Sequence, residues 1–167
     1  IPLFALESQE PVRNFDFLGF TLQYEMCYTN ILQVLELSKI PVFAKDRTAD
    51  DPIVIGGGPC TYNPEPIADF FDIFYIGEFE SGYEEILDIY KECKKNGMTR
   101  REYLERVSQL EGIYVPSFYD VEYNDDGTIK SYRKNYDKAP DKVRKQIEMK
   151  LDEAYYPVKP LVPFVKV

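Results

Sequence analysis

The stretch Pro52-Ile-Val-Ile-Gly-Gly-Gly-Pro-Cys60 decides the fold. Residues 52 to 55 predict a short β-branched strand, and the glycines that follow, with Pro59, end that strand. Glycine has no Cβ, so such a strand end lets the backbone approach a ligand closely. The triplet is equally compatible with a simple tight turn. It is neither a Walker A loop, because no Lys-Ser/Thr follows, nor GxGxxG, because Pro59 interrupts the helix start.

Further apolar runs on both sides of this stretch predict a sheet. Phe15 to Gln23 is interpreted as a buried strand, and Ile73 to Ile76 as the next strand after the glycines. Pro2 to Leu6 and Ile40 to Phe43 are weaker strand candidates. Because the central strands are apolar on both faces, they favour a mostly parallel sheet with helices on both sides.

Helical spacing of apolar residues recurs between these strands. A helix is predicted over 29–38, with Thr29 as its N-cap, and a short helix over 67–71. A longer helix is predicted over 81–95 and is expected to end at Asn96-Gly97. Thr99 and Glu102 form a capping-box pattern for a further helix that ends near 109.

The pattern changes after Gly112. Residues 113–123 and 128–134 alternate around an Asn-Asp-Asp-Gly turn and predict a β-hairpin, and 140–154 is predicted to be helical. Residues 155–167 contain three prolines and are interpreted as a linker. The sequence is therefore divided into an α/β domain over 1–112, a hairpin and helix extension over 113–154, and the linker.

Composition excludes several classes of function. The net charge is −9, so no nucleic-acid partner is predicted. No apolar run has the length of a membrane span, so no membrane is predicted. The chain has no histidine, which excludes a Ser-His-Asp triad or a histidine-based zinc site within it. Its three cysteines lie far apart without a CxxC pattern, which indicates a reducing, cytoplasmic location. No catalytic residue and no metal ligand is predicted.

Three strand ends carry small or polar residues, at 21–23, 56–60 and 77–80. In a parallel sheet such ends meet at one edge, where α/β proteins bind ligands. The predicted cofactor-binding residues are Thr21, Gln23, Gly56, Gly57, Gly58, Pro59, Gly77 and Glu78. For Glu78, capping of the following helix is an alternative role.

The order of these segments is more specific than any one of them. Asp16, Gly19 and Thr21 fit a pattern D-x-x-G-x-S/T, Gly56-Gly57 fits V-x-G-G, and residues 72–80 fit D-x-x-x-x-G-E-x-E. Together they resemble the cobalamin-binding-like domain that precedes the core of many radical S-adenosylmethionine (radical SAM) proteins. The sequence GGGPCTYNPEPIADFFDIFYIGE resembles the sequences of one uncharacterised subgroup, in which this domain lies immediately before the radical core.

The resemblance implies a flavodoxin- or Rossmann-like domain, with cobalamin as its candidate cofactor. The chain contains no CxxxCxxC, so the iron–sulfur cluster and S-adenosylmethionine of the parent protein are expected outside it. The cobalamin-ligating histidine of the fullest motif is absent too. The family's first strand has no counterpart, so a homodimer, a strand swap or patching by the C-terminal segment is expected beside 15–23.

The leading hypothesis is an accessory domain that has no catalysis of its own and serves a radical SAM enzyme of unknown reaction. Its expected partner is the parent's radical core. A structural or docking scaffold with a vestigial pocket is the second hypothesis, and an independent nucleotide-binding module is the third.

Overall fold

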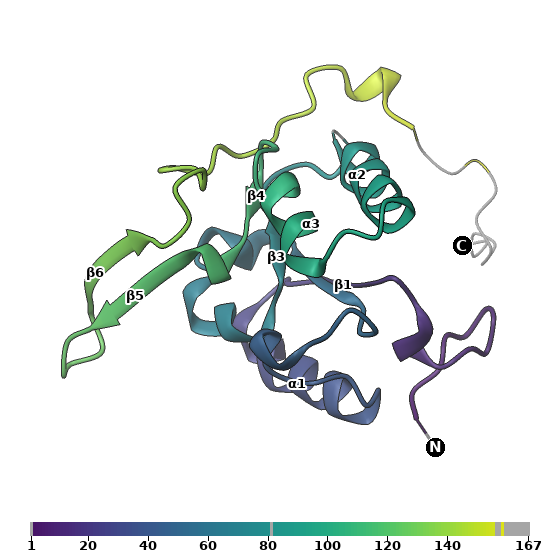
Figure 1. Ribbon diagram of the computed structural model, residues 1–167, viewed down its shortest axis with the longest axis horizontal. Coiled ribbons are helices and arrows are strands. Elements are labelled where there is room, and N and C mark those ends of the chain that lie inside the picture. The colour runs from purple at the N-terminus through teal and green to yellow at the C-terminus, as the bar shows by residue number, and fades with distance from the viewer. Residues whose placement is uncertain (1, 81, 156–157, 159–167) are drawn as a thin grey trace, which may run out of the picture.

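A four-stranded sheet forms the centre of the computed structural model, which describes residues 2–80, 82–155 and 158. Its order is β1-β2-β3-β4, with bounds Phe17–Thr21, Ile53–Gly57, Ile73–Tyr75 and Ile113–Tyr114 (Figure 1). The first three strands are parallel and β4 is antiparallel to β3. The predicted α/β class and mostly parallel sheet are confirmed.

Strand β1 lies at the edge of this sheet. Phe17 pairs with Ile53, and the register continues to Thr21 opposite Gly57. The prediction of a buried strand over 15–23 is therefore wrong in one respect: the strand forms, but none of its five residues is fully buried. The physical reason is that, within the described residues, β1 has a neighbour on one side only.

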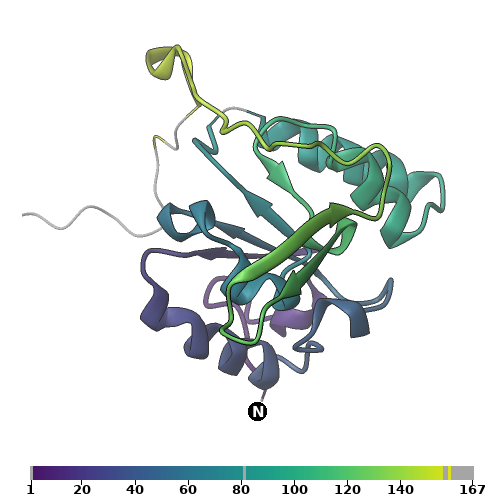
Figure 2. The same ribbon diagram turned by 90° about the vertical axis from the view of Figure 1, so that its left-hand side faces the viewer.

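Helices cover both faces of the sheet (Figures 1 and 2). Helix α1, Tyr28–Leu37, lies on one side, and α2, Tyr83–Lys95, and α3, Arg100–Val107, pack together on the other. The Phe17 ring contacts Tyr90 of α2, with centroids 4.7 Å apart, and Tyr103 of α3. Because side chains alternate along a strand, residues 17, 19 and 21 of β1 all face α2 and α3.

The three longer helices predicted before Gly112, over 29–38, 81–95 and 99–109, are present with small differences in their ends. Thr99 accepts the backbone N–H of Glu102 and the Glu102 carboxylate accepts the Thr99 N–H, so the capping box is present. Helix α2 ends before Asn96-Gly97, where Gly97 has a φ of 66°. Thr29 is not an N-cap, because α1 begins at Tyr28 and its N-cap Cys27 makes no side-chain cap.

Other connections are 3-10 turns rather than strands or α-helices. Pro2–Leu6 forms a single bridge, Phe4 to Pro11, and 40–43 forms no strand. The short helix predicted over 67–71 is a 3-10 helix. The 3-10 segments are Val12–Asn14, Glu25–Cys27, Ala44–Asp46, Pro59–Tyr62, Glu65–Phe70, Pro116–Phe118 and Leu151–Glu153.

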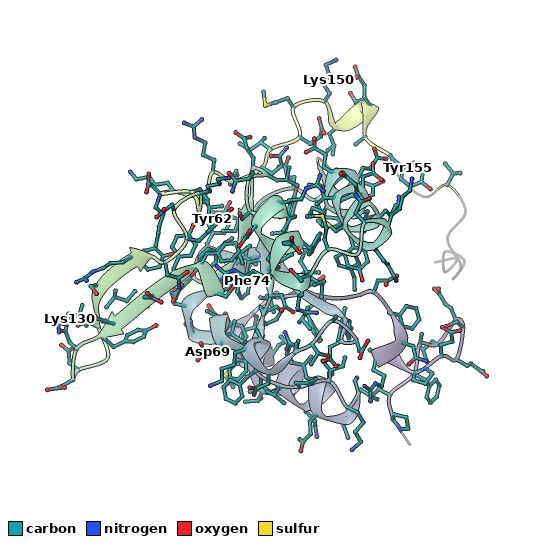
Figure 3. The ribbon with its side chains drawn as sticks, in the orientation of Figure 1. Tyr62, Asp69, Phe74, Lys130, Lys150 and Tyr155 are labelled. Carbon is teal, nitrogen blue, oxygen red and sulfur yellow. The ribbon has the colours of Figure 1, made fainter. Side chains whose placement is uncertain are left out.

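The hairpin is confirmed with different bounds. Strands β5, Tyr119–Tyr123, and β6, Ile129–Lys134, form a separate two-stranded sheet that projects from the body (Figure 1). Figure 3 places Lys130 near its tip and Phe74 within the body. The predicted single strand over 113–123 is wrong, because β4 joins the central sheet and Pro116 starts a 3-10 turn between them.

The segment after the hairpin is extended rather than helical, so the helix predicted over 140–154 is wrong. Within 140–154, only Leu151–Glu153 forms a 3-10 turn. The segment instead gives its backbone groups to the body: Gly112 donates its N–H to the Arg144 carbonyl and Gln146 donates to the Ile76 carbonyl. Most of the predicted linker, 155–167, lies outside the described residues. Among the described helices, none has the length and apolarity to cross a membrane.

A buried carboxylate ties the amino ends of β2 and β3 together. One oxygen of Asp72, Oδ2, accepts the Val54 N–H at 2.8 Å, Arg47 Nη1 at 2.8 Å and Arg100 Nη2 at 2.7 Å. The side chains of Arg47, Asp72 and Arg100 are only 0%, 3% and 14% exposed. Burial lowers the pKa of Arg47, and the Asp72 carboxylate opposes that shift. This cluster stabilises the fold, because its hydrogen-bond donors and acceptors are paired within the protein.

Candidate functional site at the carboxyl end of the sheet

Two of the three predicted strand ends are direct neighbours. Thr21 pairs with Gly57, the Leu22 N–H donates to the Gly57 carbonyl at 2.6 Å, and the Cys60 N–H donates back to Leu22 at 3.0 Å. The glycine loop therefore closes around Leu22, which is fully buried. Gln23 follows directly, and its N–H donates to the Thr21 carbonyl. These bonds fix the position of 21–23 relative to 57–60.

The structure requires glycine at two of the three loop positions, and for a different reason at each. A Cβ on Gly56 would lie 2.9–3.0 Å from the Phe71 and Phe74 rings, so that glycine makes room for the core. Gly58 has a φ of 94°, and its Cβ would lie 3.1 Å from the Leu22 backbone, so it serves the turn, and Pro59 then opens a 3-10 turn. A Cβ on Gly57 would meet nothing within 4 Å. Only Gly57 is left without a structural reason.

Gly57 belongs to an uncovered strip of the sheet, which comprises Gly19, Thr21, Ile55 and Gly57. Gly19 pairs with Ile55 and Thr21 with Gly57, so the four share the face that α2 and α3 cover elsewhere. Gly19 and Thr21 are exposed, and the other two are half-buried. The nearest atom to a Cβ on Gly19 would be Ile55 Cγ2, at 3.8 Å. Neither the core nor a turn requires these two glycines, which is typical of a surface that something else approaches.

The third strand end is occupied by the chain itself. Gly77 forms a parallel bridge with Gln146, and a Cβ on Gly77 would overlap the Gln146 backbone. The Glu78 N–H donates to the Gln146 carbonyl at 3.0 Å, and Glu78 Oε2 accepts the Glu148 N–H at 2.6 Å. Glu78 does not cap α2, whose N-cap is Gly82 without a side-chain bond. Gly77 and Glu78 thus bind residues 146–148, which no sequence signal indicated.

Aromatic and apolar side chains follow each strand end. The exposed large apolar side chains after β1, β2 and β3 are Tyr24, Met26, Tyr62 and Phe79, between 51% and 72% exposed (Tyr62 is labelled in Figure 3). Phe79 stacks on Tyr83, with centroids 5.5 Å apart. Sequence reasoning did not select these residues, although each stands just beyond a predicted strand. They give the carboxyl end of the sheet an exposed apolar surface.

In the part of the chain that the structure describes, no three side chains of His, Cys, Asp or Glu gather as a metal site. Cys60 and Cys93 are buried free thiols. Burial raises the pKa of Tyr75, close to Gly77, to about 12, with a smaller contribution from Glu80, so that phenol stays protonated at neutral pH. The arrangement offers backbone, glycines and apolar surface.

Comparison with known proteins identifies the family of this chain. The family described as "Radical SAM proteins, N-terminal" matches residues 1–116. The chain belongs to this family. The match includes β1 to β4, α1 to α3 and every predicted site residue, and it ends before the hairpin.

A relative of this radical SAM N-terminal domain is an uncharacterized protein of Methanocaldococcus jannaschii, MJ0966, which is 34% identical over 117 residues. The alignment covers 68% of this chain and 24% of that protein, so the chain spans about a quarter of the relative. No solved structure matches the chain.

Proposed function

We propose that this chain is the accessory domain of a radical SAM protein and holds a ligand on the uncovered strip beside the parent's radical core. Family membership supports the accessory role. The parent would supply the iron–sulfur cluster and S-adenosylmethionine, which this family implies, and would carry out a reaction that the N-terminal domain does not identify. The observation that supports a bound ligand is the pair of glycines, Gly19 and Gly57, that the fold does not need.

Cobalamin is the ligand we propose first. A flat sheet surface without Cβ atoms at two positions suits a planar or extended group that lies against backbone. Thr21 and Gln23 stand at the end of the strip with polar side chains. Gly58 and Pro59 would shape its rim, and Gly56 the core beneath it. In this proposal Gly77 and Glu78 hold residues 146–148 beside the ligand rather than contacting it.

The test uses the intact parent protein and hydroxocobalamin, followed by the visible spectrum and by retention through gel filtration. The double variant Gly19→Val with Gly57→Val should abolish retention, because two branched side chains would fill the strip. Ser131→Val in the hairpin is the control and should retain the ligand. Both variants should melt within a few degrees of the wild type, since neither glycine position is sterically closed.

The scaffold alternative has a distinct outcome. If the wild-type parent shows no spectral change and retains no cobalamin, the cobalamin proposal is wrong, and the apolar side chains after the strands become candidates for docking the radical core. Tyr24, Met26, Tyr62 and Phe79 support that second reading, because exposed apolar clusters mark interaction sites.

A further inference from the structure

Residues 144–148, which we call the strap, continue the central sheet beyond the start of β4 (Figure 1). The Gly112 N–H, just before β4, donates to the Arg144 carbonyl at 2.8 Å. The Gln146 N–H donates to the carbonyl of Ile76, just after β3, at 2.9 Å. The strap therefore pairs with the chain beside β3 and β4 as a short strand would.

Glu78 binds the strap at two further points. Its N–H donates to the Gln146 carbonyl at 3.0 Å, and its Oε2 accepts the Glu148 N–H at 2.6 Å. A Cβ on Gly77 would overlap the Gln146 backbone, so this close approach requires glycine. The attached position of the strap is therefore specific, because backbone hydrogen bonds and one glycine define it.

The side chains of the strap contribute little to this attachment. No residue from 144 to 151 is buried, and Ile147, Met149 and Leu151 are 48%, 84% and 65% exposed. Strand β3, by contrast, consists of buried residues only. Burial of apolar side chains is the main favourable contribution to folding, and segments without it open at a lower free energy than the core. The strap is thus specifically placed but weakly held.

A small cavity lies between the strap and the body. Its volume is about 190 Å³, and it is lined by Tyr75, Gly82, Glu85, Leu110, Glu111 and Gln146. Side chains that border a gap have no packing partner on that side, so they lose the dispersion contacts that a packed segment would make. The gap beside Gln146 therefore weakens the attachment of the strap further.

We propose that the strap is a releasable contact, which opens and closes as a unit while the sheet beside it stays folded. When the strap is closed, it occupies the third strand end at Gly77 and Glu78. When it opens, the backbone groups of Ile76 and Glu78 become accessible next to the carboxyl end of β2. All of these contacts lie within the described chain, so release of the strap does not depend on a ligand in the uncovered strip.

Amide hydrogen exchange on the chain itself tests the release. We expect the amides of Gly112, Glu78 and Gln146 to share one protection factor, at least about a hundredfold below that of the core amides of Val54 and Asp72. Equal protection of the two sets would show that the proposal is wrong, because the strap would then open only when the whole domain unfolds. Unequal protection within the first set would also contradict it, because the strap would then fray rather than open as a unit.

Two proline variants separate release of the strap from loss of folding. Gln146→Pro removes the N–H that donates to Ile76, and it should lower the protection factors of the Gly112 and Glu78 amides about tenfold or more. Lys145→Pro is the matched control and should leave both amides unchanged, because the Lys145 N–H takes part in none of these hydrogen bonds. Both variants should keep the near-ultraviolet circular dichroism of the wild type. Global unfolding of the first variant alone, or unchanged protection in it, would reject a releasable strap.

Discussion

The two ends of the central sheet are held by opposite means. At the amino end, the Asp72 carboxylate binds two arginines and a backbone N–H in a buried cluster. At the carboxyl end, Gly58 and Gly77 bring backbone against backbone, with few charged side chains involved. Charged clusters are costly to disturb and leave no free groups, so the amino end serves the fold. The carboxyl end, with its open glycines and exposed aromatics, is the end at which we propose that a ligand binds.

The largest expected effect is at the amino end. Asp72→Asn leaves the buried Arg47 guanidinium without a full counter-charge, and we expect a loss of about 3–5 kcal/mol in the free energy of unfolding. Urea denaturation measures it. Asp50→Asn, on an exposed aspartate of the same end, is the control and should change stability by less than about 0.5 kcal/mol. Similar losses of unfolding free energy for both variants would mean that the buried cluster does not stabilise the fold as we describe.

A smaller effect is expected where glycine brings two backbones together. Gly77→Ala would force a strained φ, which is 124° in the glycine, and displace Gln146. We expect a loss of about 1–3 kcal/mol and faster exchange of the Glu78 and Gln146 amides. Gly57→Ala is the matched change at the open strip and should be nearly neutral. If Gly57→Ala were the more damaging of the two, the distinction between closed and open glycines would fail.

The smallest effect concerns the exposed ion pair at the amino end. Lys94 Nζ lies 2.6 Å from Asp16 Oδ1, and this bond lowers the pKa of Asp16 below its usual value, as does the hydrogen bond from Tyr90. A depressed carboxylate pKa stabilises the fold above the unfolded-state pKa of about 3.9, and this contribution is lost as the pH falls through the folded-state pKa.

Exposure limits the size of this effect. Both side chains are more than half exposed, so Asp16→Asn should cost at most about 1 kcal/mol at neutral pH and almost nothing at pH 2. Urea midpoints across this pH range test it. A cost that persisted at pH 2 would point to packing rather than to charge.

The sequence patterns predicted the positions of helices and strands better than the roles of individual residues. The strands predicted at 52–55 and 73–76, the capping box at Thr99 and the hairpin follow from local patterns. All are present, although the first strand continues through Gly56 and Gly57, which were expected to end it. The helix prediction for 140–154 was wrong because a charged, polar composition permits a helix without requiring one. Its backbone groups pair instead with Ile76, Glu78 and Gly112, partners that are far away in the sequence.

For the candidate site, the sequence by itself determined that glycines and small polar residues end three strands, because strand ends and turns are set by local backbone chemistry. Only the tertiary structure decided which glycines are needed. Gly56 leaves room for two aromatic rings, Gly58 allows a turn, and Gly77 allows the close approach of Gln146. Gly57 has no such neighbour or turn in the described chain. That distinction depends on atoms brought close by folding, and no spacing of residues along the chain contains it.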